Sequence, residues 1–385
     1  MPALLYLLAL AVFAQGTSEF VLAGLLPGIA TDLDVSVGQA GLLTSAFALG
    51  MALGAPAMAA LGRRWSPRWT LAGFLALFIA AHVLGALTDS FGVLLLSRVV
   101  AALANAGFLA VALSTVTQVV PADRQARGLS VILGGTTLAL VAGVPAGALV
   151  GDLLGWRSTL WAIVALCLPA LFAVMVATPT GRDGVDPGEP GPSVREELAA
   201  LRTRPLQVAL LLGVLVNGAT FCSFTYLAVM ATGPGGGSDR AVPGLLAMFG
   251  IGAFLGVNVA GRLADRHWRR IIALALPALA LGWIVLAISF ATPAALWVAV
   301  GVQGAMSFAA GSTLIGRIVA SARSAPTLGG AYAAVALNLG AVVGPALGSV
   351  TLGTIGDRGP ALASAGLVVI AGSVWVTARR WSEGI

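Results

Sequence analysis

The sequence contains no lysine and has few charged residues of any kind. Only 9% of its 385 residues are charged, whereas 58% are hydrophobic, and the mean hydropathy is +0.98. A water-soluble domain of this length carries a surface of which about a quarter is charged. The composition therefore excludes a soluble globular protein and predicts one that is mostly covered by lipid.

Cysteine and histidine are also scarce, with two of each. Cys167 and Cys222 lie inside apolar runs, and His82 and His267 are far apart, so neither a disulfide framework nor a metal site is predicted. The sequence shows no nucleophile with a partner base, no cluster of histidines and acids, and no cofactor-binding loop. We expect neither an enzyme nor a bound cofactor.

The positive charge of the chain comes entirely from arginine. Twenty-one arginines against 15 acidic residues give a net charge of +6. A basic chain can indicate nucleic-acid binding, but these arginines occur in short clusters between apolar runs rather than in one basic patch. That placement is typical of the loops of membrane proteins, so no nucleic-acid partner is expected.

Apolar runs of about 20 residues recur along the chain, and each is long enough to cross a hydrocarbon core of roughly 30 Å as a helix. The first run has no preceding basic residue and is too long for a signal peptide, so we interpret it as a span. The predicted fold is an all-α integral membrane protein. Its twelve expected transmembrane helices are 4–29, 38–61, 70–88, 92–118, 128–151, 158–178, 206–230, 242–264, 271–290, 294–319, 327–351 and 360–378.

The distribution of arginine predicts the orientation of these spans. With both termini in the cytoplasm, seventeen arginines fall in inner segments, whereas only Arg157, Arg240 and Arg358 fall in outer ones. Positive residues are concentrated on the cytoplasmic side of membrane proteins. We therefore expect a multi-pass membrane protein with both termini in the cytoplasm.

The longest polar stretch divides the chain into two halves. It contains GRDGVDPGEPGPSVREE, a composition that favours a flexible linker. Matching motifs follow equivalent spans, because GVPAG at 143–147 corresponds to GPALG at 344–348. We expect two duplicated six-helix bundles, 1–178 and 206–385, joined by a cytoplasmic linker at 179–205, with a substrate site between the bundles.

Glu19 is the acidic residue that lies deepest inside an apolar run. An ionised carboxylate there costs about 2.5 to 3.5 kcal/mol or more, so an acid in a span is a functional candidate. We predict that Glu19 exchanges a proton. The alternative interpretation is a structural hydrogen bond that fixes the first span to a neighbour.

Arg98 is the one cation predicted deep inside a span, because Arg262 and Arg317 fall at the cytoplasmic ends of theirs. Counting 1.5 Å per residue, Arg98 and Glu19 both fall about 10 to 15 Å below the outer surface, so the two side chains can meet. Such a pair provides a switch that a proton or a substrate opens. Alternatively, Arg98 extends to the outer headgroups and does not contact Glu19.

Amides and aromatic rings in both halves are candidate substrate ligands. They would suit an uncharged molecule with an aromatic ring and hydroxyl or amide groups. The alternative is ordinary packing between spans, which also uses polar side chains. His82 is expected to be packed or hydrogen-bonded rather than to carry a proton. The candidates are Asn105 and Phe108 in the first half, and Asn217, Phe221, Phe224 and Asn338 in the second.

Two further groups are candidate gating residues. Gly143, Pro145 and Gly147 let the fifth span kink and approach a neighbour closely, because proline removes a backbone hydrogen bond and glycine removes the side chain. Asp265 and Arg266, in the connection after the eighth span, can form a charge network that latches one conformation. The alternative for these charges is a solvated loop.

Several motifs resemble those of the major facilitator superfamily. GRLADRHWRR at 261–270 is similar to its loop signature, and LLLSRVVAALANAG at 94–107 to its fourth-span motif, whose arginine falls on Arg98. GVPAG is similar to the fifth-span signature of proton-driven antiporters. Two departures stand out: Arg63 replaces the signature aspartate after the second span, and Ala101 and Ala102 replace residues of the fourth-span motif.

Longer segments resemble the chloramphenicol efflux proteins of actinobacteria. They include GTSEFVLAGLLPGIATDL and GAYAAVALNLGAVVGPALGS. The resemblance implies a drug:proton antiporter of a bacterial plasma membrane that exports chloramphenicol or a similar uncharged amphiphilic drug, driven by the proton gradient. We expect it to act as a monomer in the bilayer, because nothing in the sequence requires a partner. Export of a sugar, a nucleoside or another small metabolite is the alternative.

Overall fold

The computed structural model describes residues 3–61, 66–121, 125–177, 197–232, 239–289, 292–322, 325 and 328–382. Within these ranges the regular secondary structure is entirely helical. Eleven helices are long and apolar enough to cross a membrane, and a bent pair at the N-terminus makes a twelfth span. The predicted all-α fold with twelve spans is confirmed.

The first six spans are formed by α1 to α8. Their bounds are α1 (Ala3–Phe20), α2 (Leu22–Asp32), α3 (Val37–Leu61), α4 (Pro67–Leu87), α5 (Phe91–Val119), α6 (Gln125–Leu138), the π-helical turn η2 (Ala139–Gly143), α7 (Val144–Leu154) and α8 (Trp156–Ala177).

The last six spans are formed by α10 to α15. Their bounds are α10 (Arg204–Phe224), α11 (Leu227–Thr232), α12 (Val242–Ile288), α13 (Pro293–Ser321), α14 (Gly329–Ile355) and α15 (Gly359–Ser382), and the short turns η3 (Ala199–Arg202) and η4 (Asp239–Ala241) precede α10 and α12.

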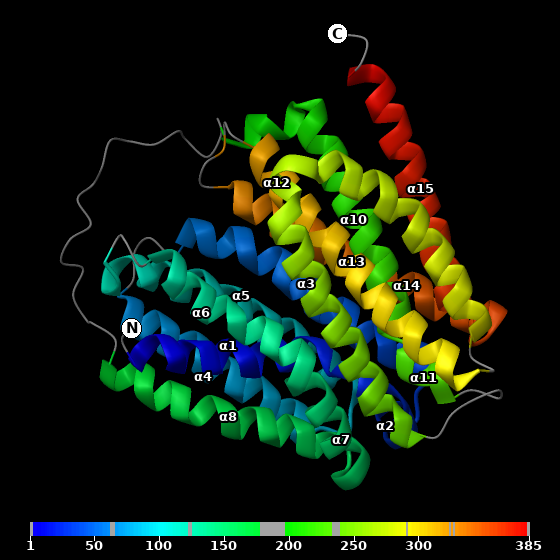
Figure 1. The fold of residues 1–385 in the computed structure, drawn as a ribbon. Helices are drawn as coiled ribbons and strands as arrows, with labels where there is room; N and C mark the ends of the chain where they lie inside the picture. Colours follow the sequence, from blue (N-terminus) through cyan, green and yellow to red (C-terminus); the bar gives the residue numbers. More distant parts are fainter. Residues whose placement is uncertain are drawn as a thin grey trace.

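The helices form two groups that follow the chain. Figure 1 shows α1 to α8, in blue to green, on one side and α10 to α15, in green to red, on the other. The main contacts between the groups are α3 with α14, α12 with η2 and α7, and α2 with α11. A hydrogen bond from Ser45 Oγ to the Val342 carbonyl (2.8 Å) links α3 to α14.

The first span of each group is broken near its end. Between α1 and α2 the chain bends by 54° at Val21. In the second group, Thr225 and Tyr226 interrupt the span between α10 and α11. A break in a span exposes backbone groups that must find other partners in the absence of water.

Glycines of the fifth span pack against the first span across its break. A methyl group on Gly143, Gly147 or Gly151 would overlap Thr17, Val21 or Leu25, respectively. Both sets are spaced by four residues, about one helical turn, so the three glycines meet the three side chains one after another across the bend. The second group repeats this packing, because Gly340, Gly344 and Gly348 of α14 lie against α10 and Tyr226.

The two ends of the molecule differ in charge. We call the end that carries Asp32, Asp89 and Arg157 the aspartate-rich end, and the end that carries Arg269 and Arg317 the arginine-rich end. The arginine distribution predicts that the aspartate-rich end is outside. Figure 1 shows α2, α7 and α11 close together there.

Tyr226 closes the aspartate-rich end between the two groups. Its hydroxyl donates to the Pro345 carbonyl (2.8 Å) and lies 3.4 Å from the Gly38 carbonyl of the other group. The ring is fully buried between Gly41 and Gly348. It fits there because neither glycine has a side chain, and a methyl group on either one would overlap Tyr226. The described conformation is therefore closed at this end.

At the arginine-rich end, α12 contains both the eighth and the ninth span. Its backbone leaves helical geometry at His267 (φ −127°, ψ 19°), between spans Val242–Ala264 and Arg266–Ile288. Trp268 follows this kink and holds the guanidinium of Arg317 over its ring at 3.9 Å. The connection after the second span, including Arg63, lies outside the described residues.

The expected linker lies partly outside the described residues, which resume at Glu197. The Glu197 carboxylate accepts a hydrogen bond from the Leu328 N–H (2.7 Å), and its carbonyl accepts one from the Tyr332 hydroxyl (2.9 Å). These bonds attach the end of the linker to the start of α14. The predicted domain boundaries stay predictions.

We predict that Gly41→Ala opens the aspartate-rich end. The new methyl group would overlap the Tyr226 hydroxyl, and overpacking of this kind costs about 1 to 3 kcal/mol, or roughly a 5- to 150-fold change in population. Spin labels at Thr31→Cys and Arg358→Cys should report a larger population of long distances.

Gly73→Ala is the matched control, since a methyl group there meets nothing within 4 Å. An unchanged distance distribution in Gly41→Ala would show that Tyr226 does not close this end.

Candidate functional site

Glu19 lies in the last turn of α1, immediately before the break at Val21. Its side chain is partly exposed. Among the described residues its carboxylate has neither a hydrogen-bond nor an ion-pair partner. A carboxyl group that is unpaired at this depth is available to a proton or to a ligand.

Arg98 of α5 is buried beside Glu19, with 2% of its surface exposed. Its Nη2 donates to the Ser18 carbonyl (2.6 Å), and its Nη1 donates to Ser18 Oγ (2.9 Å). The guanidinium also lies over the ring of Phe47, 4.6 Å from the ring centroid. Arg98 is thus held by the residue next to Glu19 rather than by Glu19 itself.

The break in the first span explains this arrangement. In a continuous helix the Ser18 carbonyl would accept from the backbone N–H four residues later. Since α1 ends at Phe20, that carbonyl is available, and Arg98 occupies it. The cation satisfies a backbone group that would otherwise be unpaired inside the bundle.

The predicted ion pair between Glu19 and Arg98 does not form in this conformation. The two charges interact electrostatically, but the guanidinium hydrogen bonds are made to Ser18. The alternative, in which Arg98 extends to the headgroups, is also wrong, because the side chain is buried. Sequence reasoning predicted that Arg98 and Glu19 come close together but missed Ser18, which holds the guanidinium.

His82 of α4 completes a buried polar cluster with Ser18 and Arg98. Its Nε2 lies 2.6 Å from Ser18 Oγ and 3.4 Å from Arg98 Nη1, and its Nδ1 lies 2.8 Å from the Phe78 carbonyl. The ring also stacks on Phe78, with centroids 4.2 Å apart. The prediction of a packed histidine holds, although the ring packs within the polar cluster.

The predicted amide ligands occupy different environments. Asn105 is buried on α5, seven residues after Arg98 and therefore on the same face of the helix. Asn217 donates to the Leu337 carbonyl of α14 (2.6 Å), and Asn338 donates to the Ala334 carbonyl of its own helix (2.9 Å). Both are partly exposed, so each retains a carbonyl oxygen for another partner.

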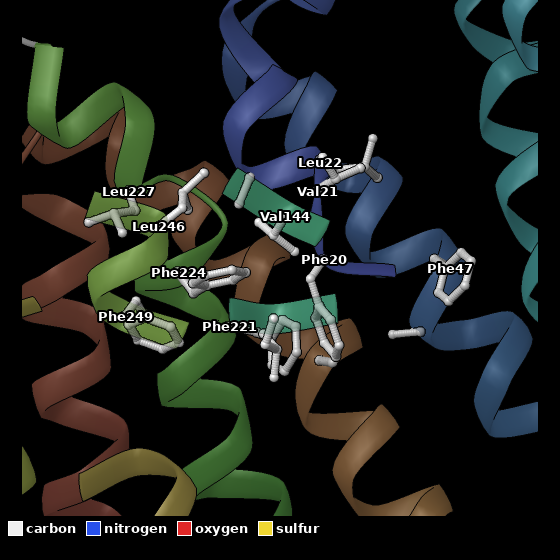
Figure 2. Close-up of a cluster of buried hydrophobic side chains, with 14 of the residues drawn as sticks. Phe20, Val21, Leu22, Phe47, Val144, Phe221, Phe224, Leu227, Leu246 and Phe249 are labelled. Carbon is white, nitrogen blue, oxygen red and sulfur yellow. The ribbon is translucent and has the colours of Figure 1, made fainter. Parts of the chain in front are cut away.

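The predicted aromatic ligands also occupy different environments. Phe108 is completely buried. Phe221 and Phe224 belong to a row of rings that crosses from one group of helices to the other. Figure 2 shows Phe20 of α1 beside Phe221, with Phe224 and Phe249 continuing the row.

The spacing within this aromatic row is that of ordinary ring contacts. Successive centroids are 5.9 Å apart for Phe20 and Phe221, 6.1 Å for Phe221 and Phe224, and 4.7 Å for Phe224 and Phe249. The row starts one residue after Glu19. Beyond Phe249 it continues to Phe308, whose centroid is 6.1 Å away, and Phe224 and Phe249 also line a small cavity with Trp283.

The candidate gating residues lie in two places. Gly143 ends the π-helical turn η2, and Pro145 and Gly147 follow at the start of α7, against the break in the first span. Arg266 is exposed at the kink of α12, whereas the side chain of Asp265 lies outside the description. The predicted latch stays a prediction.

A second charge cluster holds the far end of the first span. Arg157 at the start of α8 pairs with Asp32 at the end of α2 and with Asp89 (2.7 Å). Trp156 Nε1 also donates to the Asp32 carboxylate (3.0 Å). These contacts anchor α2 on the far side of the break.

Among the described residues no group of three or more histidines, cysteines or acids could hold a metal ion.

Comparison with known proteins identifies relatives along the whole chain. The profile of the Major Facilitator Superfamily matches residues 8–300. A chloramphenicol resistance protein of Streptomyces lividans is 56% identical over 372 residues, which cover 96% of this chain and 95% of that protein. The inner membrane transport protein YdhP of Escherichia coli strain K12 is 33% identical over 355 residues, covering 90% and 87%.

Solved structures share the fold at low sequence identity. A bacterial homologue of the human lysosomal transporter Spinster, in an inward-facing and occupied conformation, gives a TM-score of 0.76 at 19% identity, covering 98% of this chain and 96% of that chain. The nucleoside transporter NupG gives a TM-score of 0.78 at 12% identity, covering 98% and 99%.

We predict that Arg98→Lys destabilises the protein. A lysine cannot bond the Ser18 carbonyl and hydroxyl with two separate nitrogens, nor stack on Phe47 as a guanidinium does. Leaving a buried polar group unpaired costs about 1 to 3 kcal/mol. The thermal unfolding temperature in detergent should fall by a few degrees.

Arg262→Lys is the control, because Arg262 is an exposed cation of α12. Equal unfolding temperatures for the two variants would contradict the structural role of Arg98.

Proposed function

Because the chain belongs to the major facilitator superfamily, we propose that it exports an uncharged molecule across the membrane in exchange for a proton, with Glu19 as the proton carrier. The single observation that carries this proposal is the unpaired, partly exposed carboxyl group of Glu19 at the break in the first span. A carboxyl group inside a membrane span that has no partner among the described residues lowers the stability of the protein. A role in transport explains why the protein keeps it.

The likeness to a chloramphenicol resistance protein supports a drug substrate. Chloramphenicol, or a similar uncharged amphiphilic drug, is therefore the proposed cargo, and resistance is the proposed consequence. The aromatic row offers faces for a flat ring. The free carbonyl oxygens of Asn217 and Asn338 can accept hydrogen bonds from hydroxyl or amide groups.

The position of Glu19 supports a shared path for drug and proton. Phe20 follows Glu19 directly and contacts Phe221 of the other group of helices. A drug on the aromatic row therefore lies close to the carboxyl group. In the proposed cycle the drug binds from the cytoplasm as the proton leaves Glu19, and a proton from outside replaces the drug after the two groups rock.

The described conformation fits one half of this cycle. Tyr226 closes the aspartate-rich end. We propose that this end faces outside, as the arginine distribution predicts. The principal neighbours of α5 and α13 belong to their own groups. The proposed inward-open state is the one in which the protein takes up its cargo from the bacterial cytoplasm.

The energy of such an exchange is sufficient for resistance. One proton for one neutral molecule moves one net charge, and 100 mV supplies about 2.3 kcal/mol per charge. Half a pH unit adds roughly 0.7 kcal/mol. A driving force of about 3 kcal/mol maintains a gradient on the order of a hundredfold.

We predict that Glu19→Gln abolishes drug-driven proton movement but retains drug binding. The amide keeps the size of the side chain but cannot exchange a proton at physiological pH. Proteoliposomes with an internal pH dye measure the proton flux, and equilibrium binding of labelled drug measures the affinity. The flux should fall by at least about tenfold, the ratio that a loss of about 1.4 kcal/mol of coupling produces.

Asp152→Asn is the matched control, because Asp152 is an exposed carboxylate at the end of α7 in the same half. Normal proton flux in Glu19→Gln would remove Glu19 from the mechanism and with it this proposal.

We predict that expression of the wild type in a sensitive bacterium lowers intracellular chloramphenicol, and that Phe221→Ala weakens this effect. Truncation of Phe221 removes the ring that joins Phe20 to Phe224. Loss of an aromatic contact of about 0.5 to 1.5 kcal/mol corresponds to a roughly 2- to 13-fold loss of drug affinity.

Phe172→Ala is the control, because Phe172 is 72% exposed on the lipid side of α8. A protonophore should abolish the accumulation difference. Unchanged chloramphenicol levels, with efflux of a sugar or nucleoside instead, would assign the protein to metabolite export.

A further inference from the structure

We propose that Ser18 and His82 are positioning residues for proton exchange, which hold the Arg98 guanidinium against the break in the first span and away from the Glu19 carboxylate. This inference rests on the proposed role of Glu19. It assigns a task to the one buried histidine of the described spans, which the transport cycle above does not use.

The hydrogen bonds of the cluster run in one direction. A carbonyl oxygen only accepts, so His82 Nδ1 carries the ring proton that bonds the Phe78 carbonyl (2.8 Å). His82 Nε2 is then the acceptor for the Ser18 hydroxyl (2.6 Å). The Ser18 oxygen in turn accepts from Arg98 Nη1 (2.9 Å). Arg98 Nη1 also lies 3.4 Å from His82 Nε2, so both Ser18 and His82 present acceptors to the guanidinium.

Burial makes this arrangement specific. Ser18, His82 and Arg98 are exposed by 0%, 2% and 2%, so water does not replace a missing partner. Without the His82 acceptor, the Ser18 hydroxyl would turn to the carbonyl one helical turn earlier, as serine does in helices. Rotation about the Ser18 Cα–Cβ bond would then carry the oxygen that accepts from Arg98 Nη1 away from the guanidinium.

Glu19 is the anion that a released guanidinium would reach. It follows Ser18 in the chain, interacts electrostatically with Arg98, and has no other partner among the described residues. A guanidinium that pairs with the carboxylate stabilises its charged form. Protonation of Glu19 would then require a lower pH.

Few other ionisable groups surround the cluster. The elements packed against α1 are α2, α3, α5, α6, η2, α7 and α8. On their described side chains, Arg98 of α5 and Cys167 of α8 lie within the spans, whereas Asp32, Asp152 and Arg157 lie at the aspartate-rich end. The charge nearest to Glu19 is therefore that of Arg98, and its position governs the pH at which Glu19 exchanges a proton.

The same geometry argues against His82 as a proton carrier. Its Nε2 already accepts from Ser18 and faces the Arg98 cation at 3.4 Å. Glutamine can place an acceptor oxygen where Nε2 lies but does not titrate. His82→Gln therefore separates a positioning role from proton transfer.

The test measures drug-driven proton exchange in proteoliposomes as a function of pH for three variants. His82→Phe keeps a ring on Phe78 but removes the acceptor, and Ser18→Ala removes the hydroxyl. In both, we expect the half-maximal pH to fall by about one unit, a tenfold increase in the proton concentration required. His82→Gln should retain the wild-type profile.

A second readout follows Glu19 without transport. The infrared band of its protonated carboxyl group, assigned by its loss in Glu19→Gln, should disappear at a lower pH in Ser18→Ala and His82→Phe than in the wild type. Thr115→Val is the control, because it removes a buried hydroxyl that bonds only its own helix through the Val111 carbonyl.

The possible outcomes are distinct. Unshifted profiles and bands in both Ser18→Ala and His82→Phe would overturn the positioning role. Loss of coupling in His82→Gln would overturn it in favour of proton transfer by His82. If Glu19→Gln couples normally, the proposed function fails on that result alone, and the infrared titration still decides whether Ser18 and His82 position Arg98 against Glu19. Should His82→Phe not fold, Ser18→Ala carries the test.

Discussion

The bond between the Arg98 guanidinium and the Ser18 carbonyl is the interaction on which the centre of the first group of helices depends. A buried cation and an unpaired backbone carbonyl are each unfavourable inside a membrane protein. Here the guanidinium donates to the carbonyl, so both groups are paired. This bond offsets the loss of a backbone hydrogen bond at the 54° bend of the first span. The bend places Glu19 at the end of a helix, and the adjacent aromatic ring of Phe20 reaches the second group.

The duplicated architecture gives the same local solution twice. In both groups the first span is broken near the aspartate-rich end, and glycines of the fifth span in each group pack against it. The side chain that fills the break differs between the two groups, however. In the first group a cation from α5 reaches the freed backbone, whereas in the second Tyr226 occupies the break and bonds the Pro345 carbonyl. One copy therefore carries charge and the other a neutral contact between groups.

Most of the fold was predictable from sequence because lipid imposes long apolar runs, and the family relationship confirmed it. The proximity of Arg98 to the segment around Glu19 also followed from counting residues along spans. The break at Val21 was not predictable, because neither glycine nor proline stands there and tertiary contacts decide it. For the same reason the sequence indicated an ion pair where the structure has a bond to Ser18. The aromatic row was half visible, since Phe221 and Phe224 were identified on one helix, but Phe20 and Phe249 join them only through packing between helices.

The register between Gly143, Gly147 and Gly151 and the opposing Thr17, Val21 and Leu25 restricts how these spans can slide. Each small residue faces a larger one at intervals of four residues, which is about 6 Å along a helix axis. A shift of half that length would bring side chains into direct collision. The first and fifth spans therefore move together during any rearrangement, because sliding by less than one full interval would make these side chains collide.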